Sequence, residues 1–175
     1  VTLQLDPQLA RWLMLGFLFA FIVKAPMVPV HTWLPTAAEE STLGTSVLLV
    51  GILDKIGTFG MIKFCLWLFP EASTWVAPVM VVLALVSILY GAIAAIGSPN
   101  LLRLVAYTSI SHFGFMVLGI YTFTRTGISG SIFYMVNHGF STAALFLVIG
   151  FLITRRGSAL VADFGGVAKV APVLA

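Results

Sequence analysis

Five long apolar runs constrain the fold of this sequence more than any other feature. An α-helix needs about 20 mainly apolar residues to cross the hydrocarbon layer of a membrane. Strands of a membrane barrel would be about half as long and would alternate in polarity. The sequence therefore predicts an all-α fold, a polytopic bundle of transmembrane helices. The expected spans lie at about 10–34, which is broken, 44–69, 75–97, 100–122 and 128–154, and the residues from Pro35 to Gly44 are expected to form a turn between the first two.

The composition agrees with a membrane protein and excludes several other classes. Of all residues 60% are apolar and 9% are charged, and the mean hydropathy is +1.10, far from the values of an ordinary soluble domain. The net charge of +3 is small, and Arg103, Arg155 and Arg156 fall at the ends of apolar runs, as membrane anchors do. We therefore expect the lipid bilayer, and no nucleic acid, as a partner.

Cysteine and histidine usage predicts no metal or redox centre in this chain. Cys65 is the single cysteine, so the sequence contains neither a disulfide framework nor a CxxC motif. Three histidines without a cysteine cluster do not form a pattern typical of zinc, haem or iron–sulfur ligation. We expect no cofactor and no metal to be bound by these residues.

The two ends of the sequence favour a piece of a longer protein. The chain starts with Val1, and a new apolar run begins near Pro172 where it stops. We interpret residues 1–175 as an internal fragment of one membrane domain. The alternative is a complete small membrane protein that lacks only its initiator methionine.

The first apolar run carries a charge at the point where a helix is expected to break. Lys24 lies about twelve residues into the run and is followed closely by Pro26 and Pro29, which remove backbone donors and oppose a straight helix. A lysine near the centre of a membrane costs about 2.5–3.5 kcal/mol on insertion scales and usually faces a protein or water-filled interior. This combination is typical of broken helices in ion-translocating proteins.

Four titratable residues are predicted at nearly one depth. From a rise of about 1.5 Å per residue, each lies within roughly two turns of the centre of its own span; they are Lys24, Lys55, His112 and His138. Protons can pass between such groups when about one water separates successive partners, and histidine changes its charge nearest to neutral pH. We predict that these four residues form a proton path across the bundle.

Each of these residues also has a purely structural interpretation. Lys24 could cap free carbonyls at the helix break, and Lys55 could be neutralised by Asp54, although adjacent residues point about 100° apart on a helix. His112 and His138 could each be a packing residue with satisfied ring nitrogens. These alternatives remain open from the sequence.

Four segments carry a resemblance to a known family. They are KAPMVPVHTWLP from Lys24, GILDKIGTFG from Gly51, RLVAYTSISHFGF from Arg103 and VNHGFSTAALF from Val136. They resemble the proton-translocating antiporter-like subunits of respiratory complex I, and the resemblance extends over essentially the whole chain. Within that family the segments are most similar to the M-type subunits, equivalent to mitochondrial subunit 4. They are less similar to the L- and N-type subunits and to the large subunits of Mrp sodium/proton antiporters.

The resemblance implies a fold and a role for each candidate residue. The family fold has fourteen transmembrane helices in two inverted repeats, each with a broken helix, and this chain resembles an internal part of it. Lys24 matches the broken-helix lysine, Lys55 the lysine that links the two half-channels, and His112 and His138 the polar residues that continue the axis. The segment from Thr36 to Glu39 departs from the family's usual Asp-Ala-His, so no role is assigned there. The acidic partner of Lys24 is expected upstream, and the terminal residue of the path downstream.

The resemblance also implies the activity. We expect a non-redox, proton-translocating membrane subunit of NADH-quinone oxidoreductase, driven by electron transfer from NADH to quinone elsewhere in the complex. NADH, FMN, iron–sulfur clusters and quinone would be held by partner subunits, and the antiporter-like L- and N-type subunits would be neighbours. The expected location is the bacterial inner (plasma) membrane, which the chain crosses several times.

Two other functions remain open from the sequence. The first is the large subunit of an Mrp-type sodium/proton antiporter, which has no redox partner. The second is a structural membrane scaffold in which ion pairs neutralise the lysines.

Overall fold

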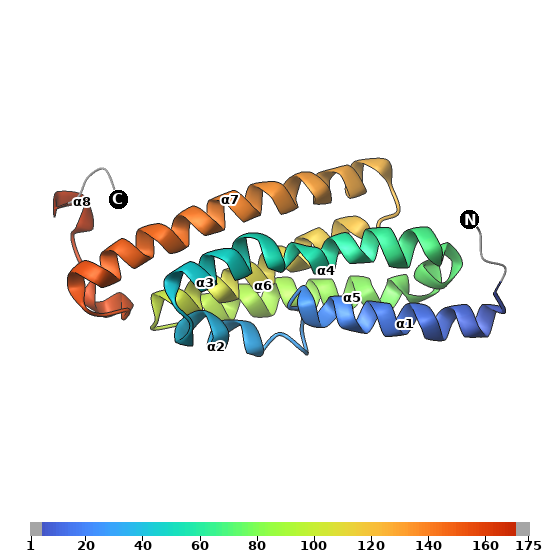
Figure 1. The fold of residues 1–175 in the computed structure, drawn as a ribbon, viewed down its shortest axis with the longest axis horizontal. Coiled ribbons are helices and arrows are strands. Elements are labelled where there is room, and N and C mark those ends of the chain that lie inside the picture. The colour runs from blue at the N-terminus through green and yellow to red at the C-terminus, as the bar shows by residue number, and fades with distance from the viewer. Residues whose placement is uncertain (1–4, 171–175) are drawn as a thin grey trace.

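Long helices that run along a common axis make up the fold (Figure 1). The computed structural model describes residues 5–170. The first helix, α1 (Pro7–Lys24), begins at Asp6, whose carboxylate accepts hydrogen bonds from the backbone N–H groups of Gln8 and Leu9 at 3.1 and 3.3 Å. This side chain satisfies donors that the first turn of a helix leaves free.

The helix break predicted after Lys24 is confirmed. α1 ends at Lys24, and the helix resumes only at α2 (Trp33–Glu40). Two side chains form hydrogen bonds with the backbone at the break. The indole N–H of Trp33 donates to the carbonyl oxygen of Val23 at 3.0 Å. The hydroxyl of Ser87 accepts from the backbone N–H of Val28 at 3.0 Å. Backbone groups that a continuous helix would have paired therefore find other partners, as an apolar environment requires.

The prediction of a turn from Pro35 onward is wrong in its first part. α2 continues to Glu40, and only then does the chain turn into α3 (Leu43–Leu48). Pro35 is the third residue of α2, in the first turn, where its missing N–H would have had no helical partner. The proline therefore accompanies the start of this helix and does not end it.

The second apolar run forms one helical rod with two wide turns. α3 passes into the π-helical segment η1 (Leu49–Leu53), then into α4 (Lys55–Gly60) and a second π-helical segment, η2 (Met61–Leu66). In η1 the N–H of Asp54 donates to the carbonyl of Leu49, five residues earlier, at 3.1 Å. Such π segments are rare and often occur at functional sites.

Three long helices follow. They are α5 (Pro70–Ile96), α6 (Leu101–Ile120) and α7 (Arg125–Arg156), and the short η3 (Val161–Asp163) and α8 (Val167–Val170) come after them. The predicted spans at 75–97, 100–122 and 128–154 fall on α5, α6 and α7. Within residues 5–170 four helices, α1, α5, α6 and α7, are long and apolar enough to cross a membrane. The chain is a multi-pass membrane protein.

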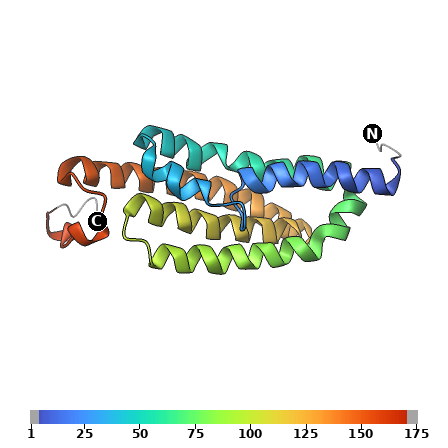
Figure 2. The ribbon, with the colours of Figure 1, turned by 90° about the horizontal axis from the view of Figure 1, so that it is seen from below.

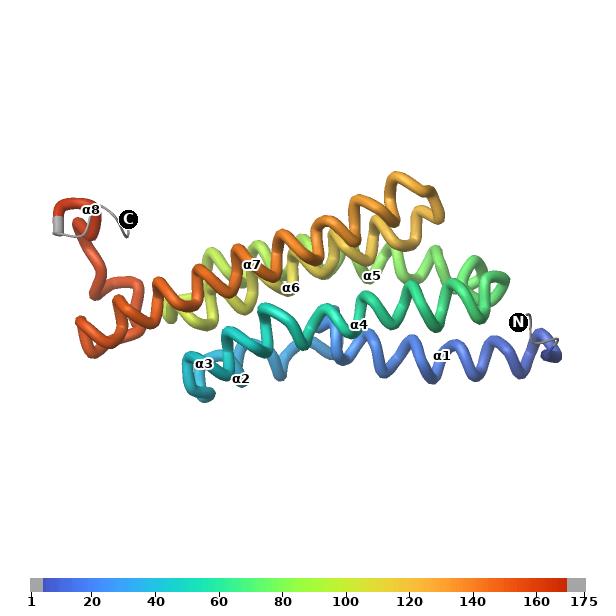
Figure 3. Tube along the Cα trace, turned by 45° about the horizontal axis from the view of Figure 1, so that its top comes forward, coloured from blue at the N-terminus to red at the C-terminus, as the bar shows by residue number. Residues whose placement is uncertain are grey.

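The arrangement of the helices places α4 at the centre of the bundle. α4 lies between α1 on one side and α6 with α7 on the other (Figure 3). α5 packs along α6, and the turn between them lies at the same end of the bundle as α2 and the end of α7 (Figure 2). At this end the carboxylate of Glu39 accepts from Arg103 and from Asn100, both at 2.9 Å. The ion pair fixes α2 to the start of α6.

Two apolar clusters form the core, one toward each end of the helices. Val50, Ile110 and Phe146 belong to one cluster, and their counterparts Met61, Phe113 and Met135 on the same three helical rods belong to the other. On the rods of α4, α6 and α7 the boundary between the clusters contains titratable residues. These residues are Asp54, Lys55, His112 and His138.

Candidate functional site

Two histidines meet between α6 and α7 at this boundary. The ring centroids of His112 and His138 are 4.9 Å apart. His138 is buried, with 3% of its surface exposed, and its Nδ1 has no hydrogen-bond partner among residues 5–170. Nδ1 of His112 is hydrogen-bonded to the hydroxyl of Tyr134 at 3.0 Å, and the two rings stack. The two histidines and the tyrosine form a continuous polar contact across the α6–α7 interface.

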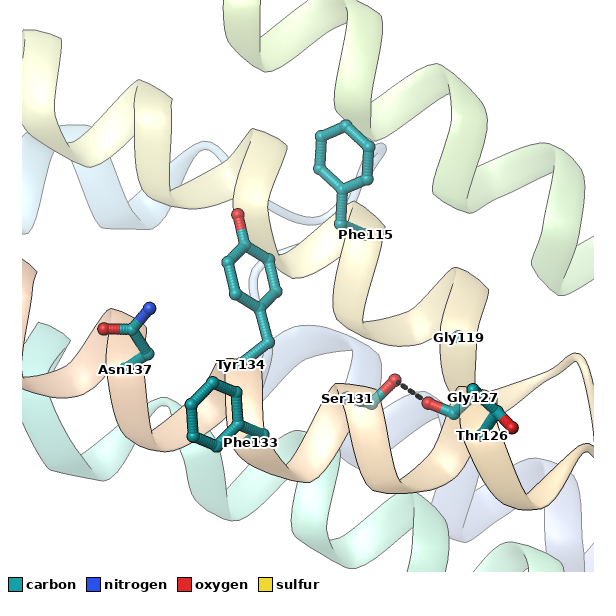
Figure 4. A pocket seen from close by; sticks show the side chains of 9 residues that line it. Phe115, Gly119, Thr126, Gly127, Ser131, Phe133, Tyr134 and Asn137 are labelled. Atoms are coloured by element: carbon teal, nitrogen blue, oxygen red, sulfur yellow. Dashed lines mark hydrogen bonds between the residues drawn. The ribbon is translucent and has the colours of Figure 1, made fainter.

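Tyr134 also lines a groove on the outer face of α6 and α7 (Figure 4). Tyr134 and Asn137 of α7 and Phe115 of α6 are among its lining residues. In the figure the Tyr134 ring extends from α7 toward α6, which is the direction of His112. The hydroxyl of Tyr134 therefore joins the histidine pair to the wall of a groove.

Lys55 lies on the other side of the histidine pair, at the start of α4. Its ammonium group is 5.3 Å from the ring centroid of Phe113, a distance at which a cation is attracted by the face of the ring. The ring of Phe113 also contacts the ring of His138, with 5.7 Å between the two centroids. Lys55 also donates a hydrogen bond to the carbonyl of Val50. Val50 belongs to η1, whose π-helical winding is wider than that of an α-helix, and its carbonyl lies within hydrogen-bonding reach of the Lys55 ammonium.

Small residues bring the helices together at Lys55. A methyl group placed on Gly139 of α7 would lie 2.7 Å from the carbonyl oxygen of Gly51, and one on Gly51 would lie 3.3 Å from the side chain of Ala143. Close approach through small residues is typical of membrane helices. Beside this contact a largely apolar groove between η1 and α7 reaches Lys55, with Ile52 and Phe140 in its walls.

Lys24 lies on the opposite side of α4, at the end of α1. The two segments approach closely at Gly57, where an added methyl group would be 2.6 Å from the backbone nitrogen of Ala25. Within residues 5–170 Lys24 forms no ion pair; Arg103 and Glu39 form the one that occurs there. The structure thus brings Lys55, His112 and His138 together and holds Lys24 one helix away from them.

The ion pair considered for Lys55 and Asp54 does not form. Lys55 points toward Phe113 and Val50, whereas both carboxylate oxygens of Asp54 lack a hydrogen-bond partner in the described part of the chain. His31, in the break after α1, is buried, and its ring forms an edge-to-face contact with the ring of Tyr90 at a centroid distance of 4.6 Å. Both ring nitrogens of His31 lack partners within residues 5–170.

Sequence reasoning missed Tyr134 and Phe113 as parts of this site. A signal for Tyr134 was available, because it precedes His138 by four residues and therefore shares its side of α7. Phe113 adjoins His112 in sequence, but its contact with Lys55 depends on how α4 and α6 pack. No sequence pattern reports that contact.

A broken helix and a row of basic side chains between two apolar cores are typical of ion-translocating membrane proteins. The chain belongs to the family described as NADH:quinone oxidoreductase/Mrp antiporter, transmembrane, which it matches over residues 3–175.

Individual relatives agree with this assignment. The chain is 58% identical over 170 residues to NADH-quinone oxidoreductase subunit M of Mycobacterium tuberculosis, covering 97% of this chain and 31% of that protein. It is similar to a chain of respiratory complex I from Thermus thermophilus, with a TM-score of 0.92 and 34% identity, over 97% of this chain and 36% of the other. A chain of the Mrp complex from Dietzia gives a TM-score of 0.84 and 29% identity, over 90% and 29%. The chain therefore spans about a third of the length of these relatives.

Proposed function

We propose that this chain is part of a proton-translocating, M-type membrane subunit of NADH-quinone oxidoreductase. Residues 1–175 would then form one internal segment of a longer subunit. The identity to subunit M over 97% of this chain supports the subunit type. The observation that carries the mechanism is the contact of His112 with His138, with Lys55 next to them across Phe113.

The proposed path runs through Lys24, Lys55, His138 and His112. The Lys55 ammonium can release a proton toward the unpaired Nδ1 of His138, and the short distance between the histidine rings lets His112 receive it. Lys55 and His138 share no direct hydrogen bond within the described residues, so a bridging water or a lysine rotation would complete the transfer. The Tyr134 hydroxyl then gives His112 a further partner on the groove side.

The driving force would come from partner subunits. When redox chemistry elsewhere in the complex changes the charge near one end of the row, each group changes the proton affinity of the next by electrostatics. In this proposal the present chain binds no cofactor, and NADH, FMN, iron–sulfur clusters and quinone belong to other subunits. L- and N-type antiporter-like subunits would be its neighbours in the bacterial inner membrane.

Replacing Lys55 tests the proposal. In the assembled complex, Lys55→Ala should lower proton pumping and the coupled turnover, and His138→Ala should lower them less because water can occupy the space of the ring. Lys63→Ala is a matched control, since Lys63 belongs to the same helical rod but stacks over Trp67 at 3.7 Å. Pumping by NADH-energised membrane vesicles is the measurement. Unchanged pumping in Lys55→Ala would contradict the proposed path and favour a structural role for the lysine.

A second candidate is the large subunit of an Mrp-type sodium/proton antiporter. The likeness to the Dietzia Mrp complex favours it as the alternative, although the identity is half of that to subunit M. Vesicles containing the assembled protein distinguish the two: an antiporter would move protons in response to a sodium gradient without NADH.

A further inference from the structure

Asp54 is a buried acid that the path described above does not use. Its side chain is 0% exposed, and neither carboxylate oxygen has a hydrogen-bond partner among residues 5–170. A buried polar group without a partner is unusual in folded proteins, and an acid at this depth of a membrane protein is costly unless a proton or a cation neutralises it. The neighbours of Asp54 therefore decide how its carboxyl group is neutralised.

The helix geometry separates Asp54 from Lys55 although they are adjacent in sequence. Successive residues of a helix point about 100° apart, and Lys55 points toward Phe113 of α6. Asp54 precedes Gly57 by three residues and so shares its side of the rod. Gly57 is the residue that packs against the backbone of Ala25, directly after Lys24. Asp54 thus belongs to the side of α4 that meets the broken end of α1.

The charged neighbours of Asp54 are the two lysines of the row. Lys55 follows it directly on its own rod, and Lys24 ends α1 next to Ala25, which packs on Gly57 three residues after Asp54. Neither forms an ion pair with it within 4.0 Å in the described residues. Beyond Lys55, the ring of Phe113 contacts both the Lys55 ammonium and His138 of α7, and His138 contacts His112 of α6. The carboxyl group of Asp54 therefore has a lysine on its own rod and another at the end of the packed helix α1, and within residues 5–170 it forms an ion pair with neither.

The backbone at Asp54 also differs from that of a regular helix. Its N–H closes the π segment η1 by donating to Leu49, and the next residue, Lys55, begins α4. Along the rod, Val50 before it and Met61 after it belong to different apolar clusters. The acid is thus at the boundary between the two cores, at the depth of the row.

We propose that Asp54 is an additional proton carrier that connects Lys24 to Lys55, a role that rests on the function proposed above. In the first step the Asp54 carboxylate takes a proton from the Lys24 ammonium, breaking one N–H bond and forming one O–H bond, which leaves a neutral amine and a carboxylic acid. In the second step the acid gives the proton to a neutral Lys55 amine, which restores the carboxylate and an ammonium. Each step moves one proton and requires no other reactant.

The test is Asp54→Asn in the assembled complex, compared with Lys55→Ala. The amide has almost the same shape as the carboxyl group but cannot carry a proton in this way. Pumping per NADH oxidised by energised vesicles should fall by as much in Asp54→Asn as in Lys55→Ala. The double variant should pump no worse than Lys55→Ala alone, because both residues act in one series. Asp54→Glu keeps a carboxyl group and should restore most of the pumping.

A spectroscopic measurement separates proton transfer from a structural role. Infrared difference spectra of the complex, recorded with and without NADH, should contain a carboxylic acid C=O band that is absent in Asp54→Asn and shifted in Asp54→Glu. A carboxyl group that only supports packing would not change its protonation on energisation and would give no such band. Absence of this band in the wild-type complex would overturn the proposal.

The remaining outcomes are also decisive. If Lys55→Ala loses pumping while Asp54→Asn pumps normally, the proposed function stands and the role of Asp54 is refuted. If both variants pump normally, the proposed path itself fails. If Asp54→Asn does not assemble, Asp54→Leu, which fills the site with an apolar side chain, takes its place, and normal pumping by that variant refutes the role.

Discussion

The hydroxyl of Tyr134 lies 3.0 Å from Nδ1 of His112, and the two side chains come from different helices. The bond holds one nitrogen of the His112 ring, and the ring centroid of His138 is 4.9 Å from that of His112. In the proposed path the bond would influence which nitrogen of His112 exchanges a proton with His138, so Tyr134 would be a positioning residue for the histidine pair.

Tyr134→Phe should reduce proton pumping without preventing assembly. The substitution keeps the stacked ring and removes only the hydroxyl, a hydrogen bond worth about 0.5–1.5 kcal/mol. We expect a smaller loss of pumping than in Lys55→Ala, measured in NADH-energised vesicles.

Tyr121→Phe provides the matched control for this measurement. The Tyr121 hydroxyl is buried and has no hydrogen-bond partner within residues 5–170, and the residue follows the end of α6, away from the histidines. Its removal should leave pumping unchanged. Equal pumping losses in the two variants would mean that tyrosine hydroxyls matter for stability and not for the orientation of His112.

Gly57→Ala should destabilise the packing of α4 on α1. The added methyl group would lie 2.6 Å from the backbone nitrogen of Ala25 and 2.8 Å from the carbonyl oxygen of Phe21, and backbone atoms cannot move aside as a flexible side chain can. Overpacking of this kind costs about 1–3 kcal/mol. A lower thermal unfolding temperature of the solubilised complex is the expected result.

Gly16→Ala is the control on the same helix pair. An added methyl group at Gly16 meets no atom within 4 Å in the described structure, and alanine favours a helix over glycine by about 0.5–1 kcal/mol. The unfolding temperature should therefore stay the same or rise. A larger decrease in Gly16→Ala than in Gly57→Ala would show that the α1–α4 contact is not where the structure places it.

The helices and the break could be predicted from the sequence because their causes are local. Apolar length determines a membrane helix, and Pro26 and Pro29 interrupt one wherever they occur. The sequence also predicted that His112 and His138 lie at nearly the same depth, because each is near the centre of its own apolar run. In each case a short stretch of sequence contains the whole physical reason.

Features that depend on contacts between helices could not be predicted in the same way. The π segment before Asp54 widens the helix by one residue where it meets α7, and no composition signal marks it. The direction in which Lys55 points depends on how α4 packs against α6, so a neutralising ion pair with Asp54 remained possible until the side chains were placed. α2 was missed because Pro35 was interpreted as part of a turn, although a proline in the first turn of a helix is compatible with it.

Lys24 allows a last prediction, which separates a proton carrier from a fixed charge. It is the last residue of α1, where the helix dipole and free carbonyls favour a cation, and Trp33 already occupies the carbonyl of Val23. A fixed charge at this point would serve equally well as lysine or arginine. Arginine, however, stays protonated in proteins and cannot pass its proton on. Lys24→Arg should therefore assemble, because the charge is kept, and yet pump as poorly as Lys24→Ala in NADH-energised vesicles. Pumping at the wild-type rate by Lys24→Arg would show that Lys24 releases no proton and acts only as a cation at the end of a broken helix.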